Sequence, residues 1–223
     1  MTKGKRFSLA VVLLVFLFCL GQTVEAVGMI KNVTSMAATE LSPGAAVSPG
    51  PVLQTLMPVF RWKEPQYAKQ YQFLLYADGQ EAPIFDATFD DGDEDYFQTA
   101  LRPGTLNADG KYRWQVKSIY NMNGKTSVSA STFSYFRTPA ALRSGLSETT
   151  PLRVGGGIGF QILGGVAPYE CAAETANIVK VFRQGQDPKG VHFQINALAP
   201  GTTRVMLRDS SGQQLVRTIV VQK

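Results

Sequence analysis

One stretch constrains the fold of this chain more than any other: residues 101–120, LRPGTLNADGKYRWQVKSIY. Its first half carries the turn dipeptides Pro-Gly and Asp-Gly, and its second half alternates between two sets of side chains. A period of two predicts a half-buried β-strand, since successive side chains of a strand point to opposite faces. We expect Tyr112, Trp114, Val116, Ser118 and Tyr120 to face a core, and Arg113, Gln115, Lys117 and Ile119 to face outward.

Short strand patterns separated by turn residues fill most of the remaining chain. Residues 52–138 contain about seven of them and no helical period, which is typical of a β-sandwich. Residues 152–223 again show only strand patterns, with clean alternation from Val191 to Ala197. The predicted fold class is therefore all-β, with two sandwiches in tandem.

The first 26 residues have the three parts of a secretory signal peptide. A short basic region precedes the apolar run 7–20, and small residues end at Ala26, where we expect cleavage. The rival interpretation is an uncleaved membrane anchor, although the run is short for a bilayer span. Either way we expect a secreted, periplasmic or cell-surface location, with membrane contact only through this segment if it is retained.

Two segments without periodicity frame the first sandwich. Residues 27–51 are rich in small and turn residues, and they are predicted to be a flexible leader. Residues 139–151 have a similar composition and are predicted to be the linker between residues 52–138 and residues 152–223.

The chain has 22 basic and 17 acidic residues, and part of this excess of positive charge lies in the signal peptide. The sequence contains no basic cluster, so nucleic acid is not an expected partner.

Several motifs of the first unit resemble a known module. The PVFRW sequence at 58–62, the corner 101–106 followed by Tyr112 and Trp114, and the closing FSYFRT at 133–138 resemble fibronectin type III-like modules of exported bacterial proteins. The resemblance implies a tyrosine corner, in which the Tyr112 hydroxyl bonds to backbone upstream of it. It implies a fold and no particular activity.

The second unit resembles bacterial immunoglobulin-like (BIG-type) repeats. The motifs are GGVAPY at 164–169 and a closing hairpin with APGTT at 199–203 and DSSG at 209–212. The fold class is then all-β, two tandem immunoglobulin-like/fibronectin type III-like β-sandwiches. Cys171 departs from the pattern of such repeats, and we expect it to be a small buried residue rather than a bridge between chains.

Two surface features are candidate binding sites. The outward residues Leu74, Tyr76, Arg113, Lys117 and Ile119 form a possible contact patch, against the simpler alternative of a solvated face. The acidic run at 90–95 offers Asp91, Asp93 and Asp95 at alternate positions, with Asp86 as a further ligand, so calcium is the one possible cofactor. A solvated acidic turn is the competing interpretation.

Catalysis would have to use His192, the only histidine, or the acidic loop. His192 is expected to face outward while Cys171 faces inward, so we predict no enzyme. The predicted function is a non-catalytic exported binding or structural protein of the cell envelope or extracellular space, whose partner is an envelope protein or a surface polysaccharide. The alternatives are a carbohydrate-binding accessory protein and a small hydrolase.

Overall fold

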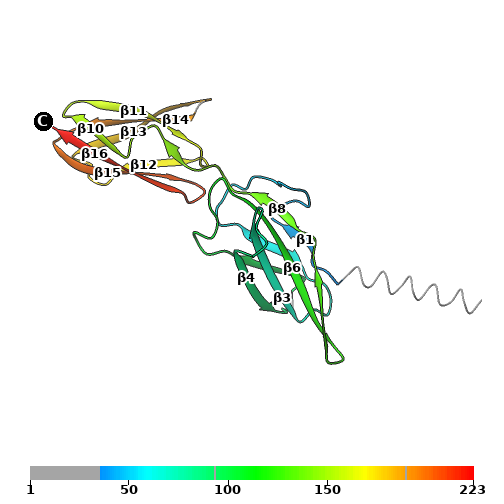
Figure 1. The fold of residues 1–223 in the computed structure, drawn as a ribbon. Helices are drawn as coiled ribbons and strands as arrows, with labels where there is room; N and C mark the ends of the chain where they lie inside the picture. Colours follow the sequence, from blue (N-terminus) through cyan, green and yellow to red (C-terminus); the bar gives the residue numbers. More distant parts are fainter. Residues whose placement is uncertain (1–35, 93, 189) are drawn as a thin grey trace, which may run out of the picture.

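The computed structural model describes residues 36–223 except 93 and 189, and every regular element in these residues is a β-strand. Figure 1 shows an elongated molecule with two sandwiches end to end, and the C-terminus lies at the far end of the second. We call residues 36–138 module one and residues 142–223 module two. The described residues include no helix that is long and apolar enough to cross a membrane. The predicted signal peptide lies outside the described residues.

Module one packs two sheets against each other. One sheet has the order β1-β2-β5, and the other has the order β4-β3-β6-β7 with β8 also paired to β6. The central strand β6 is the stretch that alternates in sequence, and its predicted inward residues are all buried. The strands are β1 (Thr39–Ser42), β2 (Val59–Lys63), β3 (Gln70–Ala77), β4 (Phe85–Asp90), β5 (Tyr96–Ala100), β6 (Lys111–Met122), β7 (Lys125–Ala130) and β8 (Ser134–Arg137).

The predicted tyrosine corner is confirmed. The Tyr112 hydroxyl accepts a hydrogen bond from the backbone N–H of Asn107 at 2.9 Å, which ties the turn to the start of β6. Trp62 and Trp114 are fully buried in the same core, and the Trp114 indole donates to the carbonyl oxygen of Pro43 at 2.8 Å. The corner therefore fixes the entry of β6 into the core.

Module two is also a two-sheet sandwich, with the strand orders β10-β16-β15-β12 and β13-β14-β11-β9. Val191, Phe193 and Ile195 are buried, while His192 lies on the outer side of β14, as the alternation predicted. The strands are β9 (Arg143–Ser144), β10 (Thr149–Arg153), β11 (Gly157–Leu163), β12 (Tyr169–Ala173), β13 (Val179–Asp187), β14 (Gly190–Ala197), β15 (Gly201–Asp209) and β16 (Gln214–Gln222).

The prediction of a flexible leader over 27–51 is wrong for its described part, residues 36–51. This part forms β1, buries Ala38 in the core of module one, and supplies the Pro43 carbonyl to Trp114. The carbonyl oxygen of Met36 accepts a hydrogen bond from the Tyr120 hydroxyl. Four residues of bulged edge strand leave no period in the sequence, so only these tertiary contacts reveal the element.

The predicted linker 139–151 is too long. Leu142 and Leu146 are buried in the core of module two, β9 pairs with β11, and β10 pairs in parallel with β16. The connection between the two modules is therefore residues 139–141. Short strands at a sheet edge and a parallel pairing at long sequence separation carry no local pattern by which sequence could find them.

Candidate functional site

The five residues of the predicted contact patch do lie on one face of module one. In the pairing of β3 with β6, Tyr76 is opposite Arg113, and Leu74 is opposite Gln115. Lys117 and Ile119 follow on the same face, opposite Gln72 and Gln70. The shared face follows directly from the period of two in both strands.

The expected exposure of this patch is wrong for two of its members, because Leu74 and Tyr76 are buried. The Phe133 ring packs edge-on against Tyr76 with centroids 5.7 Å apart, and the Arg113 guanidinium lies 4.6 Å from the Phe133 centroid. Arg113 also donates to the carbonyl oxygen of Gln80 at 3.1 Å. The outer face of β3 and β6 is thus partly closed by the β7–β8 connection, and Arg113, Lys117 and Ile119 remain half-buried.

The acidic run does not bring all of its predicted calcium ligands together. Asp86 lies within β4 and accepts hydrogen bonds from the Gln72 side-chain amide at 3.0 and 3.1 Å. Along an extended chain it stands about 16 Å from Asp91, too far for both to hold one ion. Among the described residues, no three acidic, His or Cys side chains are grouped to hold a metal. Asp93 lies outside these residues, so calcium at Asp91, Asp93 and Asp95 stays a prediction.

Asp91 belongs to a small acidic group that sequence reasoning missed. Its carboxylate accepts a hydrogen bond from the Tyr71 hydroxyl at 3.2 Å, and the Glu64 carboxyl is a second neighbour of that hydroxyl. Burial raises the pKa of Glu64 above its usual value, and the nearby Asp91 charge adds to the effect. Burial likewise raises the pKa of Tyr71.

His192 has an acidic neighbour, but Cys171 is not beside it. Its Nε2 lies 3.1 Å from a carboxylate oxygen of Asp187, on the outer face of β14. Cys171 lies in the other sheet of module two and packs against the core, where burial raises the pKa of its thiol to about 12. A thiol with this pKa stays protonated at neutral pH, whereas the thiolate is the nucleophilic form. The structure thus does not assemble a cysteine–histidine pair.

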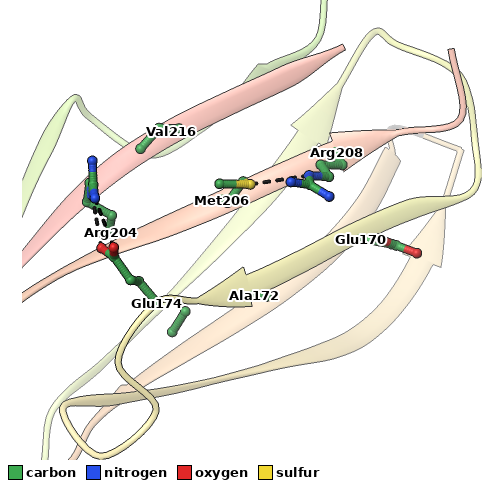
Figure 2. A pocket seen from close by; sticks show the side chains of 8 residues that line it. Glu170, Ala172, Glu174, Arg204, Met206, Arg208 and Val216 are labelled. Carbon is green, nitrogen blue, oxygen red and sulfur yellow. Dashed lines mark hydrogen bonds and ion pairs between the residues drawn. The ribbon is translucent and has the colours of Figure 1, made fainter. Parts of the chain in front are cut away.

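The outer face of β12, β15 and β16 carries the clearest candidate surface, which we call the row surface. Strand register aligns its side chains in three rows across the sheet, and Figure 2 shows the residues around them. The middle row is apolar, with Met206 and Val216 36% and 43% exposed. The rows are Glu174–Arg204–Thr218, then Ala172–Met206–Val216, then Glu170–Arg208–Gln214.

The two charged rows differ in their internal bonding. Glu174 and Arg204 form a two-pronged salt bridge with nitrogen–oxygen distances of 2.8 and 2.9 Å. Arg208 instead directs its Nε toward the Met206 sulfur at 3.2 Å, and Figure 2 shows the Glu170 carboxylate pointing away from it. A shallow groove of about 390 Å³ opens over these residues. The alternating sequences of β12 and β15 already place them on one side of each strand, and only the pairing adds that they are neighbours.

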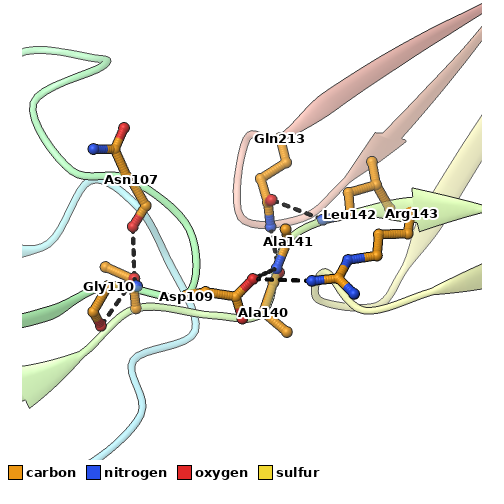
Figure 3. A network of polar contacts seen from close by, with 9 residues as sticks. Asn107, Asp109, Gly110, Ala140, Ala141, Leu142, Arg143 and Gln213 are labelled. Atoms are coloured by element: carbon orange, nitrogen blue, oxygen red, sulfur yellow. Dashed lines mark hydrogen bonds and ion pairs between the residues drawn. The ribbon is translucent and has the colours of Figure 1, made fainter.

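The junction between the modules is the second candidate feature (Figure 3). From module one, Asp109 accepts a hydrogen bond from the backbone N–H of Ala141 at 3.1 Å and lies 3.5 Å from Arg143. From module two, Gln213 accepts from the N–H of Leu142 at 2.9 Å and donates to the carbonyl oxygen of Ala140 at 3.0 Å. The connection 139–141 is therefore bonded to both modules.

These features define the class: an all-β protein of two tandem immunoglobulin-like β-sandwiches. No known protein family and no curated protein matches the sequence. One similar solved structure is domains 4 and 5 of the S-layer protein SbsC, at 12% identity over 68% of this chain and 70% of that one, with a TM-score of 0.33. Another is the C-terminal 282-residue fragment of intimin in complex with the Tir intimin-binding domain, at 14% identity over 82% and 64%, with a TM-score of 0.38.

Proposed function

We propose that this chain is an exported, non-catalytic protein of the cell envelope or extracellular space, which acts as a stiff two-module arm that displays binding surfaces. One observation carries the proposal: the connection 139–141 is hydrogen-bonded by Asp109 from one side and by Gln213 from the other. A free linker of small residues would let the modules move independently, whereas a connection whose backbone groups are bonded to both modules resists that motion.

Two further observations support the individual assignments. The strand orders β1-β2-β5 and β4-β3-β6-β7, together with the Tyr112 corner, support a fibronectin type III-like module one. In module two, the Tyr169 hydroxyl of the GGVAPY motif donates to the carbonyl oxygen of Gly164 at 2.7 Å, which supports a BIG-type repeat. Neither module needs a disulfide, because each has its own buried core.

The described residues favour binding over catalysis. His192 has Asp187 beside it, but the Cys171 thiol is in the opposite sheet. Trp62 and Trp114, which could have stacked on sugars, are fully buried. The partner we propose is therefore an envelope protein or a surface polysaccharide, contacted through outer sheet faces rather than through a cleft.

Distance measurements between the modules test the stiff arm. Spin labels at Lys125→Cys and Lys180→Cys, in a Cys171→Ala background, should give a narrow distance distribution in the otherwise unchanged chain. Asp109→Ala combined with Gln213→Ala should broaden that distribution, while Asp78→Ala, in another exposed turn of module one, should leave it unchanged. A broad distribution in the chain without the junction substitutions would contradict the proposal.

Cell fractionation tests the location. We expect the chain to begin after Ala26 and to be recovered in the envelope or the medium. Recovery of the full-length chain in the cytoplasmic fraction would overturn export.

A further inference from the structure

The row surface exposes apolar side chains at the middle of a sheet face. Met206 and Val216 stand above the face beside the smaller Ala172, and the groove lies over this middle row. A large side chain next to a small one on the same face gives a bump beside a hollow. Such a face is complementary to any surface that presents the same two features in the reverse order.

Charge on the row surface is sorted by strand. The two acidic residues are on one side, Glu170 in β12 and Glu174 directly after the end of β12, and the two basic residues opposite them, Arg208 and Arg204, are both on β15. If the two strands exchanged positions, each acidic residue of the outer rows would stand where a basic residue stood, and each basic residue where an acidic one stood.

A twofold axis makes that exchange. We propose that a second copy of this chain binds the row surface, with the axis parallel to the strands and midway between β12 and β15. Each strand then faces the other strand of the second copy across the gap of about 10 Å between packed sheets. Glu174 meets Arg204 of the second copy, Glu170 meets its Arg208, and Met206 covers the hollow over its Ala172. The surface is thus complementary to itself, as a twofold interface requires.

The third row gives this arrangement its strongest support. Glu170 and Arg208 are opposite each other in the strand register, yet no ion pair joins them, and Arg208 contacts the Met206 sulfur instead. In the proposed dimer, Glu170 of each copy lies opposite Arg208 of the other copy, so this contact between opposite charges occurs twice. Two other twofold axes in the interface plane would bring like charges together. An axis parallel to the strands but centred on β15 would place Arg204 opposite Arg204 of the second copy. An axis perpendicular to the strands would place Glu174 opposite Glu170 of the second copy.

The direction of the axis fixes the shape of the dimer. Figure 1 shows that the strands of module two run along the length of the molecule, away from module one. Because the proposed axis is parallel to these strands, the two chains would lie side by side, and both copies of module one would extend from the same end of the pair. This goes beyond the proposed function, since the arm could be stiff and exported without pairing.

Sedimentation of the chain from residue 27 to residue 223 tests the pairing. We expect concentration-dependent dimers between about 1 µM and about 500 µM, the range suited to a small interface. Glu170→Arg and Arg208→Glu should each weaken association by more than about tenfold, because the axis repeats every like-charge contact. Lys180→Glu, on the opposite sheet, should leave it unchanged.

Mixing the two variants is the decisive experiment. The Glu170→Arg chain presents two basic residues in the third row, and the Arg208→Glu chain presents two acidic ones, so an equimolar mixture should form a heterodimer that neither forms alone. Circular dichroism of each variant checks that it remains folded, which is expected since neither charge is paired within the chain. A wild-type chain that stays monomeric, a dimer unaffected by either single reversal, or a mixture that stays monomeric would each overturn the proposal.

Discussion

The two modules reach the same sandwich architecture with different cores. Module one is built from aromatic rings: Trp62 stacks on Phe97 with centroids 4.8 Å apart, and Trp114 lies 5.4 Å from Phe73. Module two is mainly aliphatic, with Ile162, Ile195, Leu207 and Ile219 fully buried. Aromatic rings fill a core with few, specifically oriented contacts, whereas branched aliphatic chains fill it with many interchangeable ones.

The modules also close their corners with the same residue type used in opposite ways. In module one the Tyr112 hydroxyl accepts from the Asn107 N–H, and in module two the Tyr169 hydroxyl donates to the Gly164 carbonyl. Each bond reaches five residues back along the chain. A hydroxyl can do either because it carries one donor and two acceptor positions, so the two corners are similar in reach but not in the backbone group that they satisfy.

The largest effect should come from breaking the aromatic core. Trp114→Ala should destabilise module one by about 3–5 kcal/mol, because it removes a large buried side chain and leaves a cavity. Both tryptophans lie in module one, so Trp62 fluorescence during denaturation reports that module alone. Module two, followed by circular dichroism, should unfold as before, and so should module one in the control Tyr67→Ala, whose side chain is 79% exposed. A shift of both transitions would mean that the two cores unfold as one.

In module two the second-largest effect should come from removing a buried polar group, the Asp209 carboxylate. The buried Asp209 carboxylate accepts hydrogen bonds from the backbone N–H groups of Val166 and Gln213, both at 2.8 Å, and joins the GGVAPY loop to the closing hairpin. Asp209→Ala should cost about 2–3 kcal/mol, since charge-assisted acceptors are lost and buried donors are left unpaired. Calorimetry should show the module-two transition lowered and the Trp fluorescence transition unchanged. The exposed control Glu148→Ala should change neither, and an equal loss in both variants would contradict the role of Asp209.

The hydrogen bonds of the two tyrosine corners should contribute differently to the free energy of unfolding. Tyr112→Phe leaves a part-buried N–H of Asn107 without its acceptor and should cost about 1 kcal/mol. Tyr169→Phe should cost less, because its hydrogen bond is exposed and water can replace the lost donor. Urea denaturation of both variants measures the difference, and equal losses would show that exposure does not separate the two corners.

The smallest effect should be a pH-dependent one in module one. Burial raises the pKa of Glu64, so the folded module holds this proton more tightly than the unfolded chain does. The stability that the proton contributes is complete below the ordinary pKa of 4.5 and is lost as the pH rises through the raised value. Glu64→Gln should therefore raise the melting temperature of module one at pH 7, with the gain shrinking toward pH 4. The exposed control Glu81→Gln should show no such trend.

Sequence prediction succeeded where the pattern is local. The alternation of β6 and β14 identified which side chains are buried, and the resemblance of residues 101–106 and Tyr112 to fibronectin type III-like modules implied the corner. It failed for the exposure of Leu74 and Tyr76, because alternation tells which face a side chain is on and not what covers that face. Here Phe133, from a connection more than fifty residues away, packs on Tyr76.

The sequence by itself determined that this chain is all-β, that it has two sandwiches, and which side chains of the long strands form their cores. A period of two is a property of each strand alone, so it can be found without knowing the neighbours. Only the tertiary structure decided that residues 36–51 complete module one, that the connection shrinks to 139–141, and that Glu170, Arg208 and Met206 share one face. These depend on pairing between strands distant in sequence, which is set by the packing of the whole module.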